Sequence, residues 1–350
     1  MTRSLTPRPR SCDGPGAARL PHRVRRTRTA LAAVAVMALV PLAAGCGGSS
    51  SSASSGGSKG TIRLVVSEGN SLPFIAAEAG AKLGVWKDKG INVKIIDATS
   101  STVGPTMASG DADISLQAGN KAAADIIQGL KAKLVAGCVL PWDQYLVAAP
   151  SSKAKSAADL KGKKFGISGF GSASHFATLR VAKSLGWNSS DYQIVQMGSL
   201  QNLIAGLKNH TIDAFIWSID PVITAQQQGY GKNLGSVAKL VGPNAFEAFS
   251  VNSSVATSRP SDVKAFFKGY YEAVSILQKD PAKAKDVVVN DWKSDPEVAD
   301  KTVPALLPLL SKDGKIPAAN RKGLGDAIRL AVKNAGNFDV DSVYSYWQDL

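Results

Sequence analysis

Residues 169–175 read Gly-Phe-Gly-Ser-Ala-Ser-His and lie between a predicted strand and a predicted helix that starts near Ser174. The first turn of a helix presents backbone N–H groups that have no partner within the helix, and the helix dipole there favours negative charge. Gly171 lets the backbone approach a ligand closely, and Ser172 or Ser174 adds a hydroxyl donor. We therefore expect this segment to bind the anionic or most polar group of a small ligand. The alternative is that either serine only caps the helix.

The histidines and cysteines restrict the chemistry further. His175 can donate to the same anion, or it can stay neutral and satisfy a backbone carbonyl. His210 ends a predicted helix at the surface and His22 lies near the N-terminus, so we expect no metal cluster. Cys138 is the only cysteine of the predicted domain and lies in an apolar run, where core packing is the usual role. A disulfide framework is not expected.

Other candidate binding residues follow the predicted strands, because ligand sites in open α/β sheets lie at the carboxyl ends of strands. The predicted ligand-binding residues are Asn70, Ser71, Phe74, Gln117, Asn120, Trp142, Phe170, Gly171, Ser172, Ser174, His175, Trp217 and Asp220. The four aromatic residues of this set either form an apolar wall of the site or pack in the core. Glu68, Asp143 and Asp220 either bind an amino group of the ligand or are loop and cap residues.

The elements that must position these residues alternate between strand and helix, which predicts α/β layers with mainly parallel sheets. The predicted strands cover 62–66, 91–96, 112–116, 133–140, 165–168, 192–197, 212–217 and 246–251. After the last of them the chain becomes strongly helical, with a long helix that follows Ser261.

Two segments of the chain echo each other. Residues 107–113 (MASGDAD) and 207–213 (LKNHTID) both end a predicted helix and enter a strand whose first turn carries Asp. About 290 residues follow the N-terminal region, and that is more than one compact core usually holds. We therefore expect two lobes of a common plan.

The N-terminal region has the features of an export signal. Residues 1–45 carry eight arginines and one Asp, so half of the net charge of +14 lies there. An apolar run at 30–44 is too short for a permanent transmembrane helix, which needs about 20 residues. The sequence Leu-Ala-Ala-Gly-Cys that ends at Cys46 looks like a bacterial lipobox, and the Gly/Ser stretch 47–58 suits a tether. Ordinary cleavage beside an incidental cysteine is the alternative.

The type and start of this signal leave two further alternatives. Arg25-Arg26 suggests a twin-arginine signal, but Arg28 and Thr29 fall where that motif has apolar residues, so we favour general secretion. A start at Val24 would give a signal of more ordinary length. The remaining lysines are scattered, and no nucleic-acid motif is present, so we expect no nucleic-acid partner.

Several short motifs, in their order and spacing, resemble the nitrate/sulfonate/taurine-type substrate-binding proteins of ABC importers over roughly residues 61–280. The motifs lie at residues 72–78 (LPFIAAE), 84–93 (GVWKDKGINV), 107–114 (MASGDADI), 158–167 (ADLKGKKFGI), 171–175 (GSASH) and 212–214 (IDA). The resemblance implies a two-lobed α/β fold of the periplasmic-binding-protein-like type II class, with two crossover strands and the ligand in the cleft between the lobes. The crossovers are expected near 146–150 and 243–250.

The N-terminal features and this resemblance together predict how the chain is divided. The expected parts are a signal peptide at 1–45, a lipidated Cys46 with a tether at 46–60, a first part of lobe one at 61–147, lobe two at 151–242, and a return strand with C-terminal helices of lobe one at 246–350.

The expected function is capture of a small organic ligand outside the cell membrane and its delivery to an ABC permease and its ATPase. The protein is expected to be a lipid-anchored monomer without a cofactor. A sulfonate, a taurine-like zwitterion or an aromatic acid suits the site best, and a thiamine-type pyrimidine or a flavin is the alternative. A ligand-presenting sensor lipoprotein is the second functional hypothesis. No nucleophile elbow, phosphate-binding loop, dinucleotide fingerprint or zinc motif is present, so an enzyme is not expected.

Overall fold

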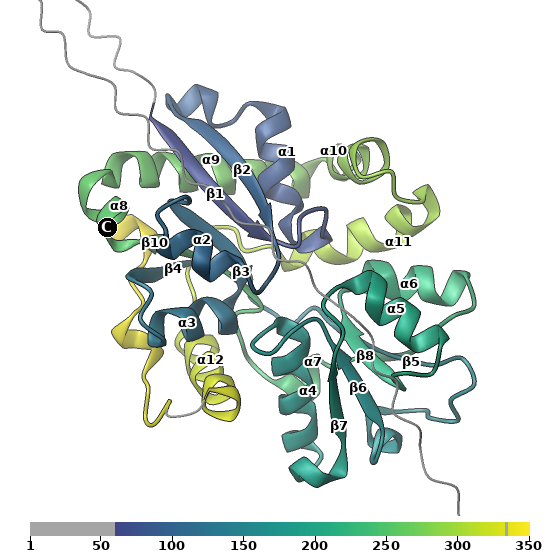
Figure 1. Cartoon of the computed structure of the whole chain (residues 1–350). Helices are drawn as coiled ribbons and strands as arrows, with labels where there is room; N and C mark the ends of the chain where they lie inside the picture. The colour runs from purple at the N-terminus through teal and green to yellow at the C-terminus, as the bar shows by residue number, and fades with distance from the viewer. Residues whose placement is uncertain (1–59, 333–334) are drawn as a thin grey trace, which may run out of the picture. The chain divides into compact units, whose positions relative to one another are not determined.

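The computed structural model describes residues 60–332 and 335–350. The predicted signal peptide, Cys46 and nearly all of the predicted tether lie outside the described residues. Residues 57–350 form one compact unit that contains two five-stranded sheets flanked by helices (Figure 1).

The first sheet has the strand order β2-β1-β3-β10-β4. Strand β1 is parallel to β2 and β3, and β10 is antiparallel to β3 and β4. The sheet therefore has four parallel strands and one antiparallel strand. Its strands are β1 (Thr61–Ser67), β2 (Asn92–Ala98), β3 (Ile114–Ala118), β4 (Ala132–Val139) and β10 (Glu247–Asn252).

The second sheet repeats this plan with the strand order β7-β6-β8-β5-β9. Strand β6 is parallel to β7 and β8, and β5 is antiparallel to β8 and β9. Its strands are β5 (Tyr145–Ala148), β6 (Lys164–Ile167), β7 (Gln193–Gln196), β8 (Ala214–Trp217) and β9 (Lys232–Ser236).

The chain passes between the sheets twice, and the antiparallel strand of each sheet follows directly on a passage. The first passage connects β4 to β5, and the second connects β9 to β10. The first lies earlier than the expected position at 146–150, because Tyr145–Ala148 pairs with β8 and β9 and so belongs to the second sheet. The expected boundary of lobe one at residue 147 therefore cuts through β5.

The repeat at 107–113 and 207–213 has the same structural role in both sheets. The backbone N–H of Arg63 in β1 donates to Asp113 Oδ2 at 2.8 Å. The backbone N–H of Lys164 in β6 donates to Asp213 Oδ2, also at 2.8 Å. Asp113 therefore connects the start of β3 to β1, and Asp213 connects the start of β8 to β6. The two sheets share this contact as well as their strand plan.

Helices cover both sheets and fill the C-terminal part of the chain. The helices between the strands are α1 (Ile75–Leu83), α2 (Val103–Ala108), α3 (Gly119–Ile127), α4 (Ala173–Ser184), α5 (Leu200–Lys208), α6 (Ile219–Gln227) and α7 (Ala238–Val241). The later helices are α8 (Ser253–Ser258), α9 (Pro260–Lys279), α10 (Pro281–Asp286), α11 (Pro296–Leu306) and α12 (Ala318–Ala331).

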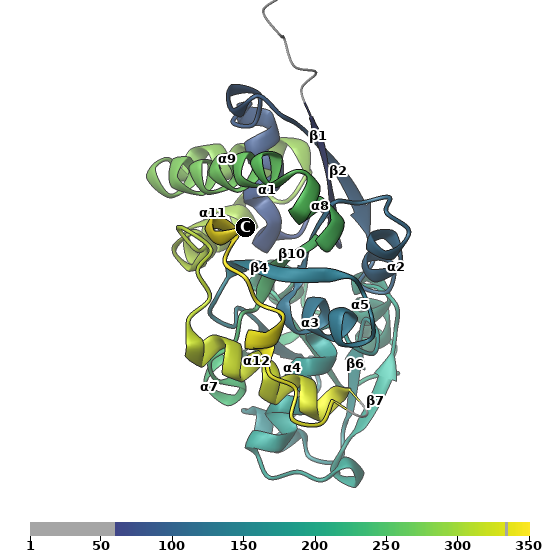
Figure 2. The same cartoon turned by 90° about the vertical axis from the view of Figure 1, so that its left-hand side faces the viewer.

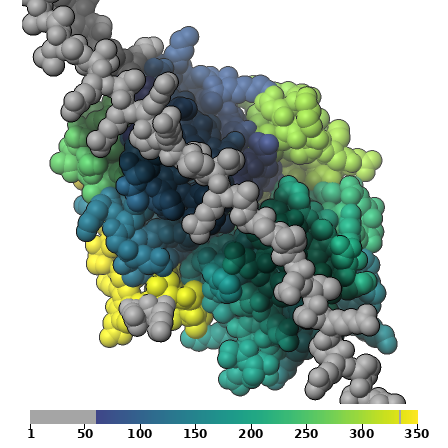
Figure 3. Space-filling view, in the orientation of Figure 1, coloured from purple at the N-terminus to yellow at the C-terminus, as the bar shows by residue number. Residues whose placement is uncertain are grey.

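The C-terminal helices contact both halves of the structure. Helix α9 packs on α1, whereas α12 packs on both α3 and α4, as Figure 2 shows. Helix α11 packs on α6, and in the space-filling view its lime-green residues lie against teal-green residues of the second half (Figure 3). The C-terminal segment therefore connects the helices of the two sheets as well as covering the first.

The core is apolar and follows from the helix stripes. In α9, Phe266, Phe267 and Tyr270 are fully buried, and Phe249 of β10 packs its ring edge-on against Tyr270, 4.7 Å between centroids. Cys138 is buried there with its Sγ 2.9 Å from the Tyr270 hydroxyl, so its predicted core position is confirmed. Over the described residues, no helix is both long and apolar enough to span a bilayer.

Candidate ligand-binding site

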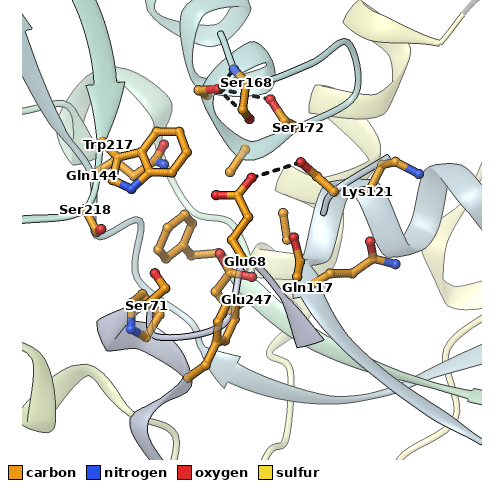
Figure 4. A pocket seen from close by; sticks show the side chains of 18 residues that line it. Glu68, Ser71, Gln117, Lys121, Gln144, Ser168, Ser172, Trp217, Ser218 and Glu247 are labelled. Atoms are coloured by element: carbon orange, nitrogen blue, oxygen red, sulfur yellow. Dashed lines mark hydrogen bonds between the residues drawn. The ribbon is translucent and has the colours of Figure 1, made fainter. Parts of the chain in front are cut away.

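A pocket lies where the carboxyl ends of strands from the two sheets face each other, with a cavity of about 40 Å³ (Figure 4). Strands β1 and β3 supply residues from the first sheet. From the second sheet, β8 supplies Trp217, and Ser168 directly follows β6. Strand β10 is antiparallel, so its first residues reach the same edge. The lining residues are Ser67, Glu68, Ser71, Pro73, Phe74, Ser100, Gln117, Ala118, Lys121, Gln144, Ser168, Ser172, Ala173, Ser174, Trp217, Ser218, Phe246 and Glu247.

Three serine hydroxyls gather at the start of α4. Ser172 is the N-cap residue, and its Oγ accepts from the backbone N–H of His175 at 3.3 Å. Ser174 Oγ accepts from the backbone N–H of Ser168 at 3.1 Å and lies 3.0 Å from Ser172 Oγ. These bonds leave the N–H groups of Ala173 and Ser174 at the positive end of the helix dipole, beside the pocket. This serine cluster can accommodate an anionic or hydrogen-bond-accepting group.

His175 does not line the pocket. Its Nδ1 accepts from the backbone N–H of Gly171 at 3.0 Å, which requires the neutral ring with its proton on Nε2. Burial lowers the pKa of His175 to about 4, so the ring is neutral at physiological pH. The imidazole therefore holds the loop at Gly171, whose φ is +83°, and does not carry a positive charge toward a ligand.

Two carboxylates project into the pocket opposite the serine cluster (Figure 4). Glu68 directly follows β1 with φ +59°, and its Oε1 accepts from the Ser100 hydroxyl at 3.1 Å. Glu247 begins β10 and is 5% exposed, and its Oε2 has no hydrogen-bond partner among the described residues. Burial raises the pKa of Glu247 well above its ordinary value, and repulsion from Glu68 adds to the effect.

Lys121 is the only cationic residue among those that line the pocket. Its Nζ pairs with Asp125 one turn further along α3. Asp125 Oδ2 also accepts from Gln117 Nε2 at 3.2 Å, so the Gln117 amide is oriented with its nitrogen toward Asp125. The Oε1 atom of Gln117 is buried without a partner in the described part of the chain. Lys121 is therefore already paired and does not neutralise Glu68 or Glu247.

The aromatic residues divide between the pocket and the core. Phe74, Trp217 and Phe246 line the pocket. Trp142 is buried beside Phe246, with 5.1 Å between ring centroids, and its Nε1 donates to Gln144 Oε1 at 3.2 Å. Phe170 is 65% exposed and packs edge-on against the His175 ring.

A second acidic pair lies next to the lining residues Gln144 and Ser218. Burial raises the pKa of Asp143 to about 7, and the nearby Asp220 adds to this effect. Burial also raises the pKa of Asp220 to about 6, although its Oδ1 accepts from the Ser218 hydroxyl at 2.8 Å. Neither carboxylate lines the pocket itself.

The structure thus brings together part of the predicted set of ligand-binding residues. The predicted residues that line the pocket are Ser71, Phe74, Gln117, Ser172, Ser174 and Trp217, and those that do not are Asn70, Asn120, Trp142, Phe170, Gly171, His175 and Asp220. Asn70 is exposed in a turn with φ +58°, because the chain reverses there before α1. Asn120 is fully buried in the first turn of α3, and it is the neighbouring residue, Lys121, that lines the pocket.

The predicted set of ligand-binding residues lacks Lys121, Gln144, Ser100, Ser218 and Glu247, which also line the pocket. Ser100 and Ser218 follow strands β2 and β8, so a complete survey of strand ends would have found them. Glu247 stands at the amino end of an antiparallel strand, and the rule about carboxyl ends does not select such a position.

Comparison with solved structures shows the fold. The alkanesulfonate-binding protein SsuA from Xanthomonas axonopodis pv. citri bound to MOPS aligns with a TM-score of 0.70 at 16% identity, over 83% of this chain and 100% of that chain. The periplasmic aliphatic sulphonate binding protein SsuA from Escherichia coli gives 0.62 at 15%, over 80% and 94%. The periplasmic nitrate-binding protein NrtA from Synechocystis PCC 6803 gives 0.67 at 14%, over 82% and 86%.

These similarities confirm the predicted two-lobed α/β fold class of periplasmic binding proteins and the predicted resemblance. The three similar proteins are described as binding proteins for alkanesulfonate, aliphatic sulphonate and nitrate. No curated protein matches the chain. The family model described as NMT1/THI5 like matches residues 69–284, more than half of the chain. The chain therefore belongs to the NMT1/THI5-like family.

Proposed function

We propose that the protein is the extracytoplasmic substrate-binding component of an ABC importer, held at the membrane by a lipid on Cys46. It captures a small organic ligand between two lobes and delivers it to the permease. In this proposal lobe one contains the first sheet with α1–α3 and the C-terminal helices, and lobe two contains the second sheet with α4–α7.

The pocket between the two sheets carries this proposal. Residues from both sheets line it, at the strand ends where ligands bind in open α/β sheets. A ligand that contacts both the serine cluster and Glu68 would connect the lobes, so its binding energy would favour the closed arrangement over the open one.

The shape and chemistry of the pocket guide the choice of ligand. The serine cluster suits a sulfonate or carboxylate group, and Trp217 and Phe74 suit an apolar or ring portion. A taurine-like zwitterion, a sulfonate, an aromatic acid or a small pyrimidine combines such groups.

A thermal-shift screen tests the proposal. Residues 57–350 form one compact unit and are suited to a screen against sulfonates, aminosulfonates, pyrimidines and aromatic acids. A ligand at 100 times its Kd stabilises the folded state by about 2.7 kcal/mol, which raises the melting temperature. The proposal fails if no compound of these classes stabilises the protein.

Tryptophan fluorescence tests whether a compound that stabilises the protein binds in the pocket. Trp217 lines the pocket, whereas Trp187 packs against Phe165 and Tyr192 away from it. The ligand-induced change in emission should disappear in Trp217→Phe and persist in Trp187→Phe.

The lipid anchor has its own test. We expect Cys46→Ala to release a soluble or unprocessed form, since the proposed acylation needs this thiol. Fractionation of the processed variant with membranes, as for the parent, would refute the anchor without affecting the binding function.

A further inference from the structure

The pocket contains more hydrogen-bond acceptors than donors on the side of the first sheet. Glu247 Oε2 and Gln117 Oε1 are buried and have no partner among the described residues. The Gln117 amide cannot turn to relieve this, because Asp125 is acceptor-only when ionised and requires the amide nitrogen on its side. A buried acceptor without a donor is costly, so a ligand group that supplies N–H donors or positive charge would be favoured beside these oxygens.

Glu68 strengthens the demand for positive charge at the same place. It holds a left-handed backbone conformation with φ +59°, which is uncommon for a residue with a side chain. Its carboxylate receives one hydroxyl bond, from Ser100, and it repels Glu247. Figure 4 shows both side chains entering the same space.

No cation of the protein compensates this pair in the described residues that line the pocket. Lys121 is the only candidate and is already bound to Asp125. A metal ion is also a poor match, because no group of three or more His, Cys, Asp or Glu in the described part of the chain can hold one. An ammonium or amidinium nitrogen supplies several N–H donors and a positive charge, which matches these unpaired acceptors.

We propose that Glu68, Glu247 and Gln117 Oε1 form a subsite for a positively charged nitrogen of the ligand. This inference rests on the proposed binding function and specifies the class of ligand: a compound with a cationic amine or amidine at one end and an acceptor group for the serine cluster at the other. Simple anions such as nitrate or an alkanesulfonate without an amine leave the subsite unfilled.

Matched pairs of probes test the subsite. Each pair replaces a cationic amine by a hydroxyl: taurine against isethionate, and benzylamine against benzyl alcohol. Isothermal titration with residues 57–350 should show that the nitrogen compound binds about 10- to 100-fold more tightly within a pair, as expected for hydrogen bonds to charged groups. Glu247→Gln should remove most of this difference, and the matched control Glu272→Gln, in an exposed pair with Lys89, should keep it.

A second measurement does not depend on a ligand. At pH 7.5 the unliganded Glu247→Leu variant should melt above the parent, because an apolar side chain of similar size replaces a buried carboxyl group that has no partner for Oε2 among the described residues. A lower melting temperature would show that the protein itself satisfies Glu247, and the subsite would be disproved.

The outcomes separate the subsite from the binding function. Equal affinity for both members of a pair, unchanged by Glu247→Gln, overturns the subsite and leaves the binding function intact. Micromolar binding of Ca²⁺ that requires Glu247 would assign the carboxylates to a metal instead. Failure of every probe and every anion to bind contradicts the binding function itself.

Discussion

At the scale of single residues, Ser172 and Ser174 at the start of α4 both form hydrogen bonds that stabilise the local backbone and line the pocket. Ser172 caps the helix through His175, and Ser174 binds the backbone of Ser168, yet both line the pocket. A cap acts on stability alone, whereas a ligand contact acts on affinity, so substitutions can separate the roles.

We expect Ser172→Ala and Ser174→Ala each to weaken ligand binding by about 10- to 100-fold, through loss of a charge-assisted bond. Each should also lower the free energy of unfolding by about 1 kcal/mol. Ser199→Ala is the matched control, because Ser199 caps α5 through Asn202 N–H and lies outside the pocket. Ser199→Ala should lose stability but keep the affinity of the parent. If Ser172→Ala and Ser174→Ala also bind the ligand like the parent, the two serines only stabilise the helix start.

His175 gives the fold a pH dependence of known sign. Its pKa is about 4 in the folded state, below the ordinary value of 6.5 that applies to the unfolded chain. Between pH 4 and 6.5 the unfolded state binds a proton that the folded state does not. The contribution of neutral His175 to the free energy of unfolding is therefore fully present above pH 6.5 and is lost as the pH falls toward 4. The limiting slope is about 1.4 kcal/mol per pH unit.

His175→Asn should flatten this slope, since the amide Oδ1 can accept from Gly171 N–H without titrating. Denaturant unfolding of parent and variant from pH 4 to 7 measures the difference. The comparison is needed because Asp143 and Asp220, with pKa values of about 7 and 6, act in the opposite direction. Parallel curves for the two proteins would refute a buried neutral His175.

At the scale of elements, the connection from β9 to β10 is fixed against α12. Asn320 Nδ2 donates to the Asn244 carbonyl at 2.7 Å, and Gly323 faces the backbone of Pro243. A Cβ atom on Gly323 would lie 1.7 Å from the Pro243 carbonyl oxygen. This close approach explains a glycine in a helix interior, where it otherwise lowers stability by about 1 kcal/mol relative to alanine.

Gly323→Ala should therefore lower the free energy of unfolding by about 1–3 kcal/mol, as overpacking does, despite its better helix propensity. Gly325→Ala in the same helix is the control, because its Cβ would meet nothing nearer than 3.4 Å. The control should be neutral or more stable. Chemical denaturation of both variants tests the contact, and equal stabilities would argue that α12 does not pack on this connection.

At the scale of the whole unit, the cavity is small compared with the roughly 300–1,000 Å³ of typical ligand pockets. Its volume of about 40 Å³, and the packing of α12 on α4, describe a closed arrangement of the two sheets. Entry of a ligand then requires the sheets to separate, and the two passages are the natural hinges.

Small-angle scattering should accordingly give a larger radius of gyration for ligand-free residues 57–350 than the closed arrangement predicts. Saturating ligand should reduce it. A single radius that matches the closed arrangement with and without ligand would rule out hinge opening as the route of entry.

Much of the fold was predictable because it depends on local patterns. The alternation of apolar strands and amphipathic helices predicted both sheets, and the paired aspartates at 113 and 213 indicated their common plan. The boundary at β5 was misplaced, because Tyr145–Ala148 is an apolar strand that suits either sheet, and only its hydrogen-bond partners decide between them.

The sequence by itself determined the α/β class, the strand ends that face a ligand and the serine-rich helix start, since each follows from neighbours in the chain. Only the tertiary structure decided which of these residues meet. In the folded chain Lys121 pairs with Asp125, and the His175 ring accepts from the backbone of its own loop at Gly171. Glu247 is buried close to Glu68, which lies 179 residues earlier in the sequence. The charge and size of a pocket depend on residues that the fold brings together from two sheets. A local periodicity in the sequence does not show which distant residues will lie close together in space.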